Sequence, residues 1–102
     1  MLDKMKQLYE FQRKARAIQK ELANSIIDAS RADGKIRVIF NGEQKLQSIS
    51  ISEEFLRPER KTELEGHLKG CIGEAITRSQ QVAAGKMKDI AGQMGISGLP
   101  GI

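Results

Sequence analysis

Three residues of types that bind metal ions lie four positions apart: Glu63, His67 and Cys71. In a helix this spacing puts the three side chains along one edge, and carboxylate, imidazole and thiolate are all zinc ligands. No fourth ligand accompanies them, and Cys71 also fits an apolar helix face. We therefore expect a packed cysteine beside a surface histidine rather than a metal site.

Motifs for enzymatic chemistry are missing from the sequence. His67 is the only candidate base, and no Ser or Cys lies in a recognisable nucleophile motif that it would activate. Neither GxxxxGK[ST] nor GxGxxG is present. Glu53 and Glu54 are adjacent carboxylates at an expected helix start, where the helix dipole explains them. We expect no enzymatic activity, no cofactor and no small-molecule substrate.

Basic side chains near the N-terminus share one face of an expected helix. At 100° per residue they form a stripe beside an apolar seam. Such cations, if they contact nucleic-acid phosphates, release condensed counterions, and a tyrosine among them adds a hydrogen bond or a stacking contact. The alternative is an ordinary solvated helix face with snorkelling side chains. The stripe consists of Lys6, Arg13, Arg16 and Lys20, with Tyr9 among them.

Two long helices are expected to position these residues. The first covers residues 2–23, and the second runs from Pro58, a good first helical residue, to Met94. Gly66, Gly70 and Gly73 inside the second helix indicate either a weak turn or a second contact surface. The first seam is Leu8, Phe11, Ala15, Ile18 and Leu22, extended by Met1 and Met5; the second is Leu64, Leu68, Cys71, Ile72, Ala75, Ser79 and Val82, drifting to Ala83, Met87, Ile90 and Met94.

Between the helices the sequence predicts a three-stranded antiparallel meander. Strands are expected at residues 25–31, 35–41 and 45–51, where apolar and polar residues alternate. The dipeptide Asn41-Gly42 predicts a tight primed hairpin turn with positive backbone dihedrals, and residues 32–34 predict another turn. One helical turn is expected at residues 52–56. The fold class is therefore α+β, with a domain at residues 1–94 and a flexible Gly-rich tail at 95–102.

Composition narrows the class of protein. The chain has 102 residues, which suits one domain, and its 17 basic and 13 acidic side chains give a net charge of +4. This mildly basic balance favours a polyanionic partner without requiring one. A single cysteine allows no internal disulfide and suits a reducing compartment. No apolar run is long enough to span a bilayer and no secretory signal is evident, so we expect a cytoplasmic protein without a membrane partner.

The length of the helices argues for assembly. At 1.5 Å per residue they measure about 33 and 50 Å, too long for a compact domain whose radius of gyration is about 13 Å. They must project beyond the sheet, pair with each other and meet a second copy. We expect a homodimer joined through the sheets and flanking helices, with the paired helices as arms. The residues predicted for the dimer interface between the sheets are Ile36, Val38, Phe40, Ile49 and Ile51.

The chain as a whole resembles the YbaB/EbfC family of small bacterial nucleoid-associated proteins. The resemblance lies in MKQLYEFQRKARAIQKEL near the N-terminus, DGKIRVIFNGEQKLQSISI in the middle and AITRSQQVAAGKMKDI before the Gly-rich end. It implies an α-β-β-β-α protomer, a tweezer-like homodimer and binding of double-stranded DNA by helical arms. It also implies a cytoplasmic, nucleoid-associated location and a role in nucleoid organisation or gene regulation.

The resemblance also assigns candidate DNA contacts. Relatives in plastids resemble accessory factors for protein targeting, so the alternative is a protein-interaction module acting in protein targeting or DNA repair assemblies. The implied DNA contacts are the basic residues of the first helix, namely Lys4, Lys6, Arg13, Lys14, Arg16 and Lys20, and three residues of the last helix, Arg78, Lys86 and Lys88.

Overall fold

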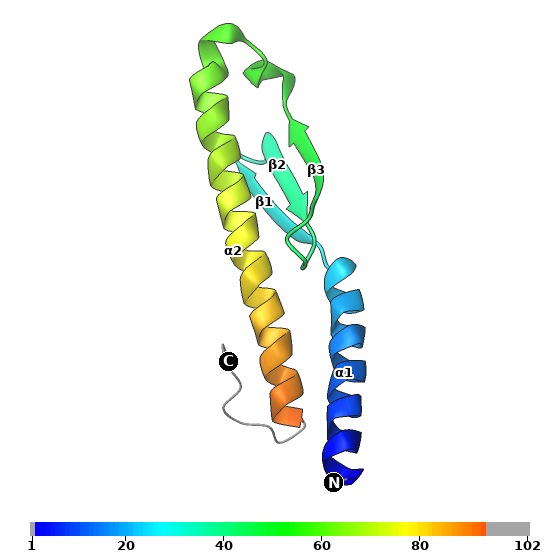
Figure 1. Ribbon diagram of the computed structural model, residues 1–102. Coiled ribbons are helices and arrows are strands. Elements are labelled where there is room, and N and C mark those ends of the chain that lie inside the picture. Colours follow the sequence, from blue (N-terminus) through cyan, green and yellow to red (C-terminus); the bar gives the residue numbers. More distant parts are fainter. Residues whose placement is uncertain (1, 94–102) are drawn as a thin grey trace.

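The computed structural model describes residues 2–93, and the elements follow the predicted α-β-β-β-α order (Figure 1). Two single 3₁₀ turns separate the sheet from the last helix. The predicted Met1 and Met94 contacts and the predicted tail at 95–102 lie outside the described residues. The helices and strands are α1 (Leu2–Ala23), β1 (Ile27–Arg31), β2 (Ile36–Phe40), β3 (Leu46–Ile51) and α2 (Lys61–Gln93), with the 3₁₀ turns at Glu53–Phe55 and Pro58–Arg60.

Helix α2 extends along most of the molecule. Figure 1 shows the sheet against its first half and α1 beside its second half, with the two helices running in opposite directions. The principal extents are 67 × 22 × 17 Å and the radius of gyration is 18.8 Å, against about 13 Å for a compact domain of this length. The predicted projection of the helices beyond the sheet is therefore confirmed. Among the described residues no helix is both long enough and apolar enough to span a membrane.

The core lies between α2 and one face of β1 and β2. The sheet order is β1-β2-β3 with both pairs antiparallel, and Val38 pairs with Ala29 on one side and Ile49 on the other. Since alternate residues of a strand share a face, Ile36, Val38 and Phe40 all point toward α2, where they pack with residues including Cys71 and Ala75. Burial of these apolar side chains stabilises the packing of α2 on the sheet.

Strand β3 lacks this cover. The main contacts of α2 with the sheet are to β1 and β2, and β3 is the strand farthest from α2 in Figure 1. Leu46 is 47% exposed and Ile49 48% exposed, although Ile49 lies across from the buried Val38. Of the residues predicted to join two copies, Ile36, Val38 and Phe40 are thus buried inside one chain. Only Ile49 and the half-buried Ile51 remain accessible to a partner.

The two hairpin turns differ from each other and, in one case, from the prediction. In the β1–β2 turn Asp33 and Gly34 have positive φ, as the two central residues of a primed turn require, and Ala32 before them has positive φ too. The primed turn predicted at Asn41-Gly42 is wrong, because neither residue has positive φ. The residue with positive φ in the β2–β3 connection is Gln44, and the Asn41 amide donates to the Lys45 carbonyl across a longer loop. Contacts of this loop with both helices, described below, account for its shape.

The start of α2 also shifts. Pro58 opens the 3₁₀ turn and the α-helix begins at Lys61. The predicted helical turn after the sheet is present as the 3₁₀ turn at Glu53–Phe55, whose Phe55 ring is buried. The guanidinium carbon of Arg60 lies 4.0 Å from the centre of that ring, a cation–π contact that fixes the chain at the entry to α2.

Candidate nucleic-acid interface

Helix α1 attaches to α2 along the predicted apolar seam, but only at its C-terminal half. Leu22 is buried and Phe11, Ala15 and Ile18 are half-buried. Met5 is 71% exposed and Leu8 59% exposed. Because α2 covers the seam only from its middle onward, the first turns of α1 extend as an arm. Both polar and apolar side chains of this arm are exposed to solvent.

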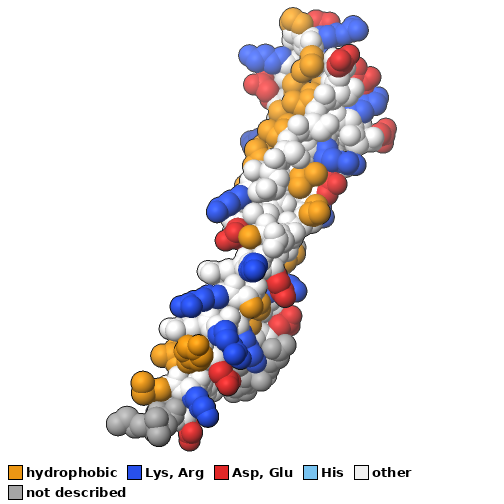
Figure 2. All heavy atoms as spheres, turned by 90° about the vertical axis from the view of Figure 1, so that its right-hand side faces the viewer, with side chains coloured by type: hydrophobic (Ala, Val, Ile, Leu, Met, Phe, Trp, Pro, Cys, Tyr) orange, Lys and Arg blue, Asp and Glu red, His pale blue; other side chains and the backbone are white. Residues whose placement is uncertain are grey.

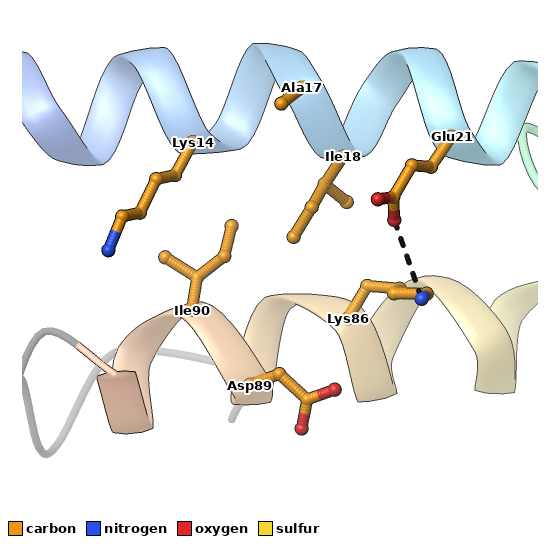
Figure 3. Close-up of a pocket in the computed structure, with 7 residues that line it drawn as sticks. All are labelled: Lys14, Ala17, Ile18, Glu21, Lys86, Asp89 and Ile90. Carbon is orange, nitrogen blue, oxygen red and sulfur yellow. Dashed lines mark ion pairs between the residues drawn. The ribbon is translucent and has the colours of Figure 1, made fainter.

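The predicted basic stripe lies on the outer side of this arm. All four of its cations are exposed. Ile18 points at Ile90 of α2 in Figure 3, and at 100° per residue the stripe is about half a turn from Ile18, so it faces away from α2. Figure 2 shows blue Lys and Arg side chains on the surface of the lower half of the molecule, as well as others over the upper half. Within residues 2–93 no ion pair engages the stripe, that is Lys6, Arg13, Arg16 and Lys20.

Part of the stripe forms a small surface hollow of about 50 Å³. Tyr9, Gln12, Arg13 and Arg16 line it, and Tyr9 is 67% exposed. Two guanidinium groups, a phenol and an amide offer several hydrogen-bond donors within one helical surface. This is the chemistry that holds phosphate oxygens, because guanidinium groups bind them with paired, charge-assisted hydrogen bonds.

Two other predicted contacts, Lys14 and Lys86, lie in a cleft between the helices rather than on the stripe. The cleft has a volume of about 270 Å³, and Ile18 and Ile90 form its apolar part (Figure 3). The ammonium group of Lys86 is 3.4 Å from a carboxylate oxygen of Glu21 on α1. Lys86 therefore links the two helices, and its charge is partly neutralised.

The remaining predicted contacts are dispersed. The Arg78 guanidinium donates to the Asp28 carbonyl at 2.6 Å, so it links α2 to β1. Lys88 is exposed, on the opposite side of α2 from Lys86. Lys4 is exposed on the seam side of α1. The structure thus brings the four stripe residues and Tyr9 onto one surface and leaves the three α2 residues apart from it.

The residues considered as metal ligands have other partners. Glu63 accepts two hydrogen bonds from Arg60, at 3.0 and 3.2 Å. The His67 ring packs edge-on against Phe55, with the ring centres 5.8 Å apart, and its Nε2 is 3.7 Å from Glu63. Cys71 is buried, and burial raises the pKa of its thiol, which disfavours the thiolate that binds metals. Within the part of the chain that the structure describes, no cluster of His, Cys, Asp and Glu has the arrangement of a metal site.

Sequence comparison identifies the family. The model of the YbaB/EbfC DNA-binding family matches residues 1–94. The chain belongs to this family. Among curated relatives, a nucleoid-associated protein of Syntrophobacter fumaroxidans is 32% identical over 96% of this chain and 91% of the relative. A nucleoid-associated protein of Chloroflexus aurantiacus is 34% identical over 93% of each chain.

A solved structure shares the fold. The crystal structure of an uncharacterized protein from Helicobacter pylori superposes with a TM-score of 0.70 at 18% identity, covering 85% of this chain and 87% of that one. The resemblance drawn from the sequence to the YbaB/EbfC family is therefore confirmed, together with its α-β-β-β-α fold. The family is one of DNA-binding proteins.

Proposed function

We propose that this YbaB/EbfC protein binds double-stranded DNA as a homodimer, chiefly through phosphate contacts made by the basic stripe of α1, and that it serves nucleoid organisation or gene regulation. The observation that carries the proposal is the exposure of Lys6, Arg13, Arg16 and Lys20 on one outward face without a described ion-pair partner. The names of the curated relatives, nucleoid-associated proteins, point the same way.

The charge balance of the two helices supports the choice of α1 over α2. On α2, Lys86 is paired with Glu21 and Arg78 is hydrogen-bonded to the sheet, so their transfer to a phosphate would break an existing contact. Within residues 2–93, the stripe cations form no ion pair that binding to a phosphate would break. Contacts to phosphates position a protein on the duplex without reading its sequence, so we expect little sequence preference.

A second copy would double the stripe. The uncovered face of β3, with Leu46 and Ile49 each about half exposed, is the apolar surface that a partner sheet would cover. Ile49 and Ile51 are the residues of the predicted dimer interface that remain accessible. Two copies joined there would carry eight stripe cations, enough for a DNA affinity that depends steeply on salt.

Charge reversal on the arm tests the proposal. The Arg13→Glu/Arg16→Glu variant removes two cations from the hollow, and we expect its affinity for a duplex of random sequence to fall at least about tenfold. The matched control is Lys61→Glu/Lys69→Glu, which makes the same change in net charge at two exposed positions of the sheet half of α2. Equal losses for both variants would mean that only net charge matters, and would overturn the assignment to α1.

A protein-interaction module in protein targeting or DNA repair is the second candidate. It draws support from the exposed Met5 and Leu8 of the arm, since flexible apolar side chains suit protein partners. A pull-down from nuclease-treated lysate separates the two functions. Partners that survive nuclease and are lost in a Met5→Ser/Leu8→Ser variant favour the second, and partners lost with the nucleic acid favour the first.

A further inference from the structure

The β2–β3 loop holds the C-terminal end of α1. The Gly42 amide donates to the Leu22 carbonyl at 2.7 Å, and the side-chain amide of Asn41 donates to the Ala23 carbonyl at 3.3 Å. The last carbonyls of a helix have no partner inside the helix. Here two of them accept hydrogen bonds from the loop, so the C-terminal end of α1 is held by the β2–β3 connection.

The same loop is bonded to α2 on its other side. Ser79 is fully buried; its hydroxyl donates to the Asn41 carbonyl at 2.9 Å and accepts from the Gln44 amide at 3.1 Å. The Asn41 side-chain oxygen meanwhile accepts from the Glu43 and Lys45 amides at 2.9 and 3.0 Å, which fixes the shape of the loop. The loop therefore connects α1 to α2 through paired polar groups at a point where Asn41 itself is only 5% exposed.

Gly42 is required by the closeness of this contact. A Cβ atom at this position would lie 2.8 Å from the Leu22 Cδ2 atom and 2.9 Å from the Leu22 carbonyl oxygen, too close for any side chain. By contrast, a Cβ atom on Gly73 of α2 would meet nothing within 4 Å. A methyl group on Gly42 can be accommodated only if the end of α1 moves away from the loop.

Elsewhere α1 is held more loosely. The ion pair between Glu21 and Lys86, whose side chains are 60% and 43% exposed, contributes little because solvent screens it. The seam is half-buried over Phe11, Ala15 and Ile18 and exposed beyond. Over a helix about 33 Å long, a 10° rotation about its C-terminal end moves the far end by about 6 Å. The same 10° rotation moves Lys6 by about 4 Å and Arg13 by about 2 Å.

We propose that Asn41, Gly42 and Ser79 form a joint that fixes the direction of α1, and that they are positioning residues for the DNA-binding stripe. The effect on DNA rests on the proposed function, whereas the effect on the direction of α1 does not. The joint contacts no DNA itself; it acts by holding Arg13 and its neighbours at a set distance from the corresponding residues of the second copy.

The direction of α1 can be measured in the full chain by double electron–electron resonance. Spin labels are introduced as Gln7→Cys on α1 and Lys88→Cys on α2, both exposed positions at the same end of the molecule, so that the measured distance runs across the two helices, in a Cys71→Ala background. Labelled chains are diluted with unlabelled chains so that distances within one chain dominate. The variants are Gly42→Ala, and Asn41→Asp, which keeps the acceptor for the Glu43 and Lys45 amides but loses the donor to Ala23. Gly73→Ala is the matched control.

We expect Gly42→Ala and Asn41→Asp to shift or broaden the distance by at least about 2 Å, about half the displacement that a 10° rotation produces at Gln7, and Gly73→Ala to leave it unchanged. The two joint variants should also bind duplex DNA several-fold more weakly while keeping the wild-type circular dichroism. An unchanged distance in both joint variants overturns the proposal, whatever happens to DNA binding. A shifted distance with unchanged DNA affinity keeps the joint but removes its role in positioning the stripe. Loss of fold in Gly42→Ala leaves Asn41→Asp to decide.

Discussion

The Ser79 hydroxyl lies 2.9 Å from the Asn41 carbonyl oxygen, across a sequence separation of 38 residues. It is a hydrogen bond between the middle of α2 and the loop that also holds the end of α1. The sequence placed Ser79 on the apolar face of α2, and the burial of Ser79 agrees with that position. The side chain nevertheless acts there as a hydrogen-bonding group, because its hydroxyl pairs with loop groups that would otherwise be buried without partners.

Replacement of Ser79 by alanine should therefore destabilise the fold more than its size suggests. The Gln44 amide would lose its acceptor, and a buried group left without a partner costs about 1–3 kcal/mol. The matched control is Thr77→Ala, which removes an exposed hydroxyl from the same helix and should change the free energy of unfolding by less than about 0.5 kcal/mol. Urea denaturation at one fixed protein concentration measures both, and equal effects would show that the Ser79 bonds contribute nothing.

The start of α2 should be sensitive to acid. The hydrogen bonds from Arg60 hold the pKa of Glu63 below its ordinary value of 4.5. Because this folded-state pKa is lower than that of the unfolded chain, the contact stabilises the fold above about pH 4.5, and the contribution is lost as the pH falls through the folded-state pKa. Glu63→Gln should thus lower the melting temperature at pH 7, and the difference from wild type should shrink on acidification below pH 4.5.

The matched control for this pH effect is Glu65→Gln. Glu65 is exposed on the same turn of α2, and no described ion pair involves it. Its replacement should give a smaller change at pH 7. A Glu63→Gln difference that stays constant from pH 7 to pH 3 would show that the Arg60 contact does not stabilise the fold.

The uncovered face of β3 predicts which apolar residue serves assembly. Ile49 is 48% exposed, so Ile49→Ser should cost one folded chain little and should raise the dissociation constant of the dimer at least about tenfold, as loss of a hot-spot side chain does. Sedimentation equilibrium measures this constant. Leu56→Ser is the control, since Leu56 is 62% exposed but lies outside the sheet. If Ile49→Ser leaves the dissociation constant unchanged, this face of β3 is not the dimer interface.

Much of the fold could be predicted because periodicity determines it. The spacing of three and four residues in α1 and the alternation of Ile36, Val38 and Phe40 specify a helix and a half-buried strand. The outward position of the basic stripe follows from the same arithmetic, since Arg13 and Arg16 are about half a helical turn from Ile18. These properties depend on neighbours within a few residues, and the sequence records them directly.

The β2–β3 loop could not be predicted in the same way. Asn41-Gly42 is the usual signal of a two-residue hairpin turn, but here Gly42 serves the close approach of Leu22 and Asn41 serves as a hydrogen-bonding side chain. Both contacts reach residues far away in the sequence. Likewise, the burial of Ile36, Val38 and Phe40 against α2 rather than against a second copy depends on which face of the sheet α2 covers, and alternation alone is the same for both outcomes.

The central claim is that exposed cations of α1 bind DNA phosphates, and the salt dependence of binding tests it most directly. The affinity of the wild-type protein for a duplex of random sequence should be measured by fluorescence anisotropy at rising salt concentration. If about half of the eight stripe cations of a dimer engage phosphates, the logarithm of the association constant should fall with the logarithm of salt concentration with a slope of about −4. Binding that does not change with salt, or no binding at low salt, would contradict the account.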